Sequence, residues 1–98
     1  MIQHTIAFKL KHAPGSQEEN AFLADAALFA AIPGVKNFSS LRQISKQNQY
    51  AFGLSMQFDD QESYDLYTAH PEHKALVEKR WLTEVSDFLE LDFSPLPA

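Results

Sequence analysis

Residues 50–58, YAFGLSMQF, alternate large apolar side chains with smaller ones, and this alternation decides the fold class. Successive side chains of a β-strand point to opposite faces, so a period of two predicts a strand with one core-facing side. The other side of the predicted strand carries Ala51, Gly53, Ser55 and Gln57, none of which is charged.

The same alternation extends outward to both ends of the chain. Residues 2–11, IQHTIAFKLK, predict a first strand in which His4 shares the apolar face. Residues 35–44, VKNFSSLRQI, are more polar and predict a strand that lies at an edge of the sheet or is bent. Residues 87–93, DFLELDF, predict a last strand with Glu90 and Asp92 on one face.

A first helix is predicted between the first two strands. Ser16 followed by Glu19 fits a capping box, in which the serine oxygen accepts from the third helical N–H and the glutamate accepts from the serine N–H. Apolar residues then recur at helical spacing as far as Pro33-Gly34. That pair ends the helix, because proline cannot continue the hydrogen-bond ladder.

A second, interrupted helical segment is predicted after the strand at residues 50–58. Asp59-Asp60 can cap a short helix that carries Tyr67. His70 precedes a proline and therefore leaves helical geometry, so we expect it to cap a new helix whose first residue is Pro71. That helix carries His73 on its apolar stripe.

The order β-α-β-β-α-β predicts one α+β domain over residues 1–98, with ferredoxin-like topology and a four-stranded antiparallel sheet. Its helices cover only one face. The bare face carries small neutral residues, which suits close approach by a second sheet. We therefore expect a homodimer that forms through the sheet face and closes a dimeric α/β barrel.

Composition excludes several function classes. The net charge of −5 and the scattered basic residues argue against nucleic acid as a partner. The chain has no cysteine, which excludes thiolate metal sites and a cysteine nucleophile. No apolar run is long enough for a membrane span, and no signal peptide is visible, so we expect a cytoplasmic protein. The three glycines are isolated, so no phosphate loop and no cofactor are expected.

Two core-directed histidines and a tyrosine are candidates for chemistry. Imidazole titrates near neutrality, so His4 and His73 can exchange protons at working pH. Tyr67 precedes the Pro71 helix and could donate a hydrogen bond to a developing oxyanion in the same cavity.

The chain resembles the stress-responsive A/B barrel (Dabb) family of the dimeric α+β barrel superfamily. The resemblance rests on the strand at residues 4–9, the Ile32-Pro33-Gly34-Val35 helix exit, the segment at residues 67–73 (YTAHPEH), Trp81 and Asp92. It covers nearly the whole chain and implies two ferredoxin-like subunits whose sheets face each other, with the helices outside.

Within that family, the plant polyketide cyclases use a Tyr and a His at the positions of Tyr67 and His73 to promote an aldol closure. The resemblance implies that His73 is the base, Tyr67 the carbonyl polariser and His4 a hydrogen-bonding residue of the pocket. The chain departs from the cyclases at Asp25 and Phe52, where those enzymes place a pocket tyrosine and a third pocket histidine. We expect both positions to line the pocket, and the substrate not to be the same polyketide.

Two functions stay open at this point. One is a stable, stress-related homodimer or small-ligand binder without catalysis, whose histidines are structural. The other is a small acid–base enzyme that performs aldol-type chemistry on an apolar carbonyl compound.

No metal site is expected, because His70 and His73 need not converge with His4. Asp92 is expected to pair with an Arg or Lys, and the remaining large aromatics to serve as core or interface residues. These aromatics are Tyr50, Tyr64 and Trp81.

Overall fold

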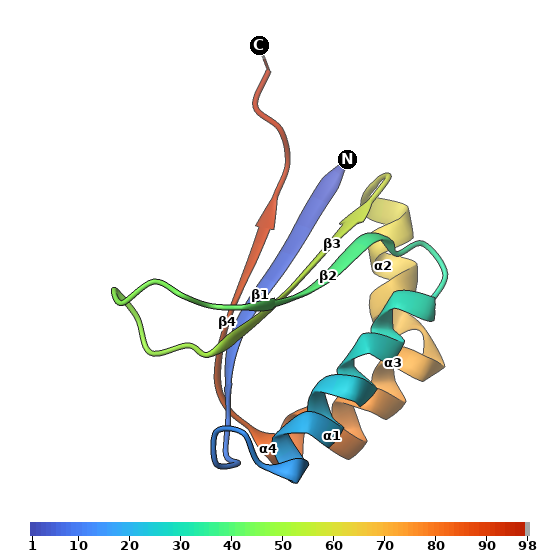
Figure 1. The fold of residues 1–98 in the computed structure, drawn as a ribbon. Coiled ribbons are helices and arrows are strands. Elements are labelled where there is room, and N and C mark those ends of the chain that lie inside the picture. The colour runs from blue at the N-terminus through green and yellow to red at the C-terminus, as the bar shows by residue number, and fades with distance from the viewer. Residues whose placement is uncertain (98) are drawn as a thin grey trace.

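A computed structural model describes residues 1–97, and its four strands form one antiparallel sheet in the order β2-β3-β1-β4 (Figure 1). The central strands are therefore the first and third along the chain. The order of strands and helices is the ferredoxin-like arrangement predicted from the sequence. The strands are β1 (Ile2–Leu10), β2 (Lys36–Arg42), β3 (Phe52–Phe58) and β4 (Val85–Phe93).

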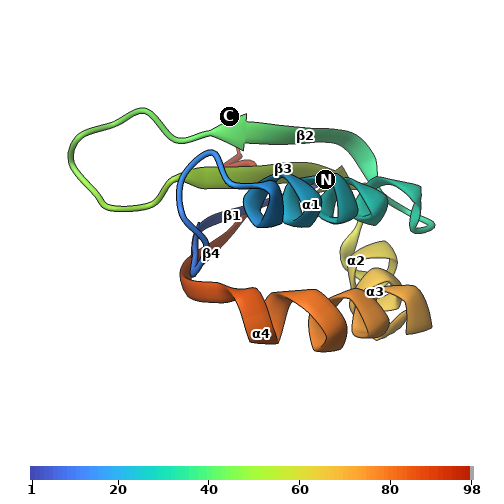
Figure 2. The same cartoon turned by 60° about the horizontal axis from the view of Figure 1, so that its bottom comes forward.

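The helices of residues 1–97 lie on one face of this sheet and leave the other face uncovered (Figures 1 and 2). Figure 2 shows two helical rows, one formed by α1 and the other by the segment from α2 to α4. None of these helices is long and apolar enough to cross a membrane. The helices are α1 (Gln17–Ala26) with a 3₁₀ extension (Ala27–Ala31), α2 (Gln61–Ala69), α3 (Pro71–Leu76) with a π-helical continuation (Val77–Trp81), and α4 (Leu82–Glu84).

Helix α1 begins with half of the predicted capping box. The Ser16 hydroxyl accepts from the Glu19 N–H at 3.2 Å, as predicted. The return bond is different, because the Glu19 carboxylate accepts from the Gly15 N–H at 3.0 Å. The Ser16 N–H instead donates to the Ala13 carbonyl at 3.1 Å. Because the turn before the helix already satisfies the Ser16 N–H, the Glu19 carboxylate accepts from the preceding residue, Gly15, instead.

Helices α2 and α3 also begin at side-chain caps. Asp60 accepts from the Ser63 N–H at 2.8 Å at the start of α2. His70 accepts from the Glu72 N–H through Nδ1 at 3.1 Å, and Pro71 is the first residue of α3. The predicted roles of Asp60, His70 and Pro71 are confirmed. The π-helical segment that continues α3 carries no sequence signal that we recognised.

The edge strand β2 is shorter than predicted and is distorted near its start. Its pairing with β3 shifts register between Lys36 and Ser39, and Asn37 has a φ of 51°. Gly34 has a φ of 94°, a conformation that L-residues rarely adopt, in the turn after the 3₁₀ extension. The sequence predicted either an edge position or a bend for this strand, and the structure shows both.

The core lies between the sheet and the helices and is largely aromatic. Phe8 of β1 is fully buried, and its ring contacts Phe22, Phe52 and Trp81 at centroid distances of 5.8, 5.7 and 5.0 Å. These four rings come from β1, α1, β3 and the π-helical segment, so they join all layers of the fold. The alternation that decides the fold class is confirmed in β3, where every second side chain is buried.

The uncovered face of the sheet has small residues at its centre and large apolar residues toward its edges. One row across the strands reads Leu41, Gly53, Ala7 and Leu89 in the pairing register. Leu89 on the outer strand is 47% exposed, and its neighbours Leu91 and Phe93 on the same face are similarly exposed. The small central residues were expected from the sequence.

Removing the α1 cap should destabilise the fold measurably. We expect Ser16→Ala to lower the free energy of unfolding by about 1 kcal/mol, because the Glu19 N–H loses its acceptor. Ser16→Asn restores an acceptor and serves as the matched control. Urea unfolding at one fixed protein concentration measures the difference. An equal loss in both variants would contradict the assignment of this cap.

Candidate functional site

A cavity of about 260 Å³ lies between the helix-facing side of the sheet and the helices. Its walls come from β1, β3, β4, the 3₁₀ extension of α1 and the segment from α2 to α4. The lining is mainly apolar, with a few polar groups, which is usual for a small-molecule site. The lining residues are His4, Ile6, Phe29, Leu54, Met56, Tyr64, Tyr67, Thr68, His73, Val77, Trp81, Leu82, Phe88 and Glu90.

Three of the residues singled out in the sequence meet at this cavity. His4 reaches it from β1, Tyr67 from α2 and His73 from α3. The His73 and Tyr67 rings lie edge to face with centroids 4.6 Å apart, and the His4 and Tyr67 rings are 6.4 Å apart. Strand alternation and the helix break at Pro71 therefore bring two imidazoles and a phenol into one site.

His4 is held by Asp92 on the neighbouring strand. The β1–β4 register places the two residues opposite each other, and His4 Nδ1 lies 2.5 Å from Asp92 Oδ1. The expected Arg or Lys partner of Asp92 is thus replaced by a histidine. Because Nδ1–H donates to the carboxylate, a neutral His4 keeps Nε2 unprotonated as an acceptor. The side chain of His4 is only 8% exposed.

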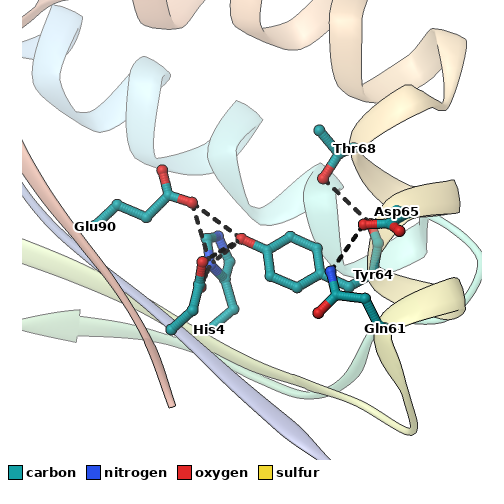
Figure 3. Close-up of polar contacts among 7 residues, drawn as sticks. His4, Gln61, Tyr64, Asp65, Thr68 and Glu90 are labelled. Carbon is teal, nitrogen blue, oxygen red and sulfur yellow. Dashed lines mark hydrogen bonds and ion pairs between the residues drawn. The ribbon is translucent and has the colours of Figure 1, made fainter. Parts of the chain in front are cut away.

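Tyr64 joins Glu90 of β4 to this pair (Figure 3). Its hydroxyl lies 2.8 Å from Asp92 Oδ2, 3.0 Å from Glu90 Oε1 and 3.0 Å from His4 Nδ1. A phenol carries one proton, and the Nδ1 proton of His4 is already directed at Asp92, so the hydroxyl donates to a carboxylate. Burial, together with hydrogen bonds to Asp92 and Glu90, raises the pKa of Tyr64 well above its usual value.

Tyr67 is buried, and its side chain forms no hydrogen bond with any group of residues 1–97. Burial raises the pKa of Tyr67 above its usual value of 10, and the charge of Glu90 adds to this effect. The phenol is therefore protonated across the physiological range. Its hydroxyl is available to donate to a ligand oxygen.

His73 packs against the rings of Phe29 and Tyr67, with centroid distances of 5.6 and 4.6 Å. Burial lowers its pKa below the usual 6.5, and the positive charge that His4 can carry acts in the same direction. A hydrogen bond with the Thr68 backbone and the charge of Glu90 oppose the shift without cancelling it. His73 is consequently neutral at pH 7, the protonation state that a general base requires.

One group of side chains has the composition of a metal site. Ligand atoms of His4, Glu90 and Asp92 lie within 4.8 Å of one another. Two ligands of the same ion with bonds of about 2 Å would lie roughly 3 Å apart, whereas His4 and Asp92 are in hydrogen-bond contact at 2.5 Å. We therefore assign this group to hydrogen bonding. His70 is used as the α3 cap.

Asp25 and Phe52 are not among the residues that line the cavity. Phe52 is buried in the core against Phe8, and Asp25 lies 3.5 Å from the guanidinium of Arg80.

Among the cavity residues, Tyr64, Trp81 and Glu90 were not singled out for the site from the sequence. The alternation of residues 87–93 carried a signal for Glu90, because it places that residue on the same face as Asp92.

Comparisons with known proteins identify relatives of the whole chain. The profile of the stress responsive A/B barrel domain (Dabb) matches residues 2–95. A Dabb-family protein with a ferredoxin-like fold from Mesorhizobium loti is 52% identical, with a TM-score of 0.97 over 98% of this chain and 97% of that chain. No curated protein sequence matches.

Two more distant structures share the fold. A dimeric ferredoxin-like protein of unknown function from Thermobifida fusca is 20% identical, with a TM-score of 0.78 over 96% of this chain and 90% of that chain. The hydroxynitrile lyase from Passiflora edulis is 10% identical, with a TM-score of 0.81 over 98% of this chain and 96% of that chain. At these identities the likeness concerns the fold alone.

The shift in His73 can be measured directly. We expect an NMR titration of its imidazole to give a pKa below 6.5, and His4→Asn to raise that pKa by removing a nearby positive charge. Glu90→Gln should lower it further, because the carboxylate favours the imidazolium. A wild-type His73 pKa at or above 6.5 would contradict the dominant effect of burial on this imidazole.

The same shift has a consequence for stability. The folded state binds the His73 proton more weakly than the unfolded state does. The contribution of His73 to the free energy of unfolding is therefore fully present above about pH 6.5 and is lost as the pH falls through the folded-state pKa.

Proposed function

The chain belongs to the stress-responsive A/B barrel (Dabb) family, and we propose that it is an acid–base enzyme acting on a small, largely apolar carbonyl compound. One observation carries the proposal. The cavity of about 260 Å³ is reached by both His73 and Tyr67, and these supply a neutral imidazole and a protonated phenol. A fully packed region around His73 would instead have favoured a structural role.

The reaction that suits this pair is proton abstraction next to a carbonyl group. His73 takes a proton from the carbon beside the carbonyl, and the electron pair of that C–H bond moves onto the carbonyl oxygen. The Tyr67 hydroxyl donates a hydrogen bond to the resulting enolate oxygen. The enolate then attacks a second carbonyl carbon, as in an aldol closure, and the protonated His73 returns its proton to the new alkoxide.

His4 has a different part in this proposal. Its contact with Asp92 occupies Nδ1, so in the neutral imidazole Nε2 accepts a hydrogen bond from a substrate hydroxyl and fixes the orientation of the substrate. The apolar walls, which include Leu54, Met56 and Val77, exclude water from the enolate. The hydroxynitrile lyase from Passiflora edulis shows that a protein with this fold can be an enzyme. It supports the proposal in that respect alone.

The second candidate function is a homodimer without catalysis, and the uncovered sheet face favours dimerisation. Leu89, Leu91 and Phe93 form an exposed apolar strip beside small central residues, a surface that is unusual on a monomer. The Thermobifida fusca relative is described as dimeric. We propose that a second copy of the sheet covers this face and closes a barrel. The cavity lies on the opposite side of the sheet, so dimerisation is compatible with either function.

Exchange of hydrogen for deuterium tests the catalytic proposal without knowledge of the natural substrate. We expect the wild type in D₂O to accelerate exchange at the carbon between the ring and the carbonyl of phenylacetone, measured by proton NMR. His73→Gln should abolish the acceleration, and Tyr67→Phe should reduce it roughly 10²-fold or more, the usual effect of losing one oxyanion donor. Exchange in His73→Gln at the wild-type rate would contradict the role of His73, and a wild type no faster than buffer would contradict the enzyme proposal.

Light scattering tests the dimer. The wild type is expected to have twice the mass of the chain, and Leu91→Asp to dissociate it by placing a charge in the apolar strip. Leu66→Asp on α2 introduces the same charge at an exposed leucine away from the sheet and should leave the dimer intact. A folded wild-type monomer at micromolar concentration would refute the proposed interface.

A further inference from the structure

Glu90, whose side chain is 43% exposed, gives the cavity a carboxylate that has no Lys or Arg partner within residues 1–97. Its carboxylate lines the cavity and contacts the Tyr64 hydroxyl at 3.0 Å and His4 Nδ1 at 3.7 Å. Within residues 1–97, no Lys or Arg lies within ion-pair distance of it, and none lines the cavity. His4 is already committed to Asp92 at 2.5 Å, so the two carboxylates share at most one positive charge.

Aromatic rings line the same cavity as this carboxylate. They come from four different parts of the chain, and the faces of aromatic rings attract cations because of their quadrupole. A cavity with aromatic walls and an unbalanced carboxylate at one side favours a cation attached to an apolar body. An anionic ligand would be repelled. The rings are those of Phe29, Tyr64, Tyr67, Trp81 and Phe88.

A second, independent feature supports a ligand with polar groups. Tyr67 is only 3% exposed, lines the cavity, and its hydroxyl has no hydrogen-bond partner among the groups that the structure describes. The hydroxyl is not one of the inaccessible unpartnered polar atoms of residues 1–97, so it opens onto the cavity. It can donate a hydrogen bond to a polar atom of a ligand.

We propose that the ligand of this cavity carries an ammonium group, which Glu90 binds, in addition to the carbonyl group that Tyr67 binds. This assignment rests on the proposed function and names its substrate class: small primary amines with an apolar body and a carbonyl group, such as amino ketones. Glu90 is the specificity-determining residue. The Tyr64 hydroxyl lies 3.0 Å from this carboxylate and 2.8 Å from Asp92, so its one proton is shared between the two acceptors.

The single tryptophan of the chain provides the readout, because Trp81 lines the cavity. The probes are 2-phenylethylamine, which is protonated at neutral pH, and 2-phenylethanol, which has the same body without the charge. Each is titrated into the wild type and into Glu90→Gln while Trp81 fluorescence is followed. Gln keeps an acceptor for Tyr64 and removes the charge. Glu78→Gln, at an exposed carboxylate outside the cavity lining, changes the net charge equally and is the matched control.

We expect the wild type and Glu78→Gln to bind the amine at least about tenfold more tightly than the alcohol. In Glu90→Gln the preference should disappear while the affinity for the alcohol is retained. Added salt should weaken the amine preference in the wild type. Circular dichroism verifies that each variant is folded.

The outcomes separate the two proposals. Equal binding of both probes by the wild type, or an amine preference that persists in Glu90→Gln, overturns the ammonium assignment and leaves the acid–base proposal standing. Binding of neither probe, with no acceleration of phenylacetone exchange, overturns both. Exchange catalysis without any amine preference overturns only the ammonium assignment.

Discussion

The hydrogen-bond register between β1 and β4 is the constraint on which both faces of the sheet depend: the helix-covered face with the cavity, and the uncovered face. It pairs His4 with Asp92, Ile6 with Glu90 and Phe8 with Phe88. A slip of one residue would turn every side chain of β4 to the opposite face. Leu89 and Leu91 would then point at the helices, and Glu90 and Asp92 would lie on the uncovered face. The register therefore positions the acidic wall of the cavity and the exposed apolar strip together.

Local signals in the sequence account for most of the fold and for part of the site. Period-two alternation placed His4 on the helix side of β1, and the break at Pro71 placed His70 at a helix cap. These inferences succeed because each depends on neighbouring residues only. The one miss in capping has the same origin, since Ser16 bonds to Ala13 in a turn whose geometry the motif does not encode.

The remainder of the site depends on contacts between residues that are far apart in the sequence. Tyr64 and Glu90 are separated by 26 positions, and His4 and Asp92 by 88. The sequence shows that such groups share a face, but not which side chains from α2, β1 and β4 converge. The positions of Asp25 and Phe52 were inferred by resemblance, and the structure gives them other neighbours: Arg80 for the first and Phe8 for the second.

The two imidazoles of the cavity differ because their surroundings differ. His4 faces the carboxylates of Asp92 and Glu90, whereas His73 faces aromatic rings and is kept neutral by burial. A positive charge on His4 acts in the same direction as burial and lowers the pKa of His73 further. Carboxylates therefore lie beside one imidazole of the cavity, and aromatic rings lie beside the other. This asymmetry arises from one carboxylate pair on one face of β4, and so from the same register that orders the sheet.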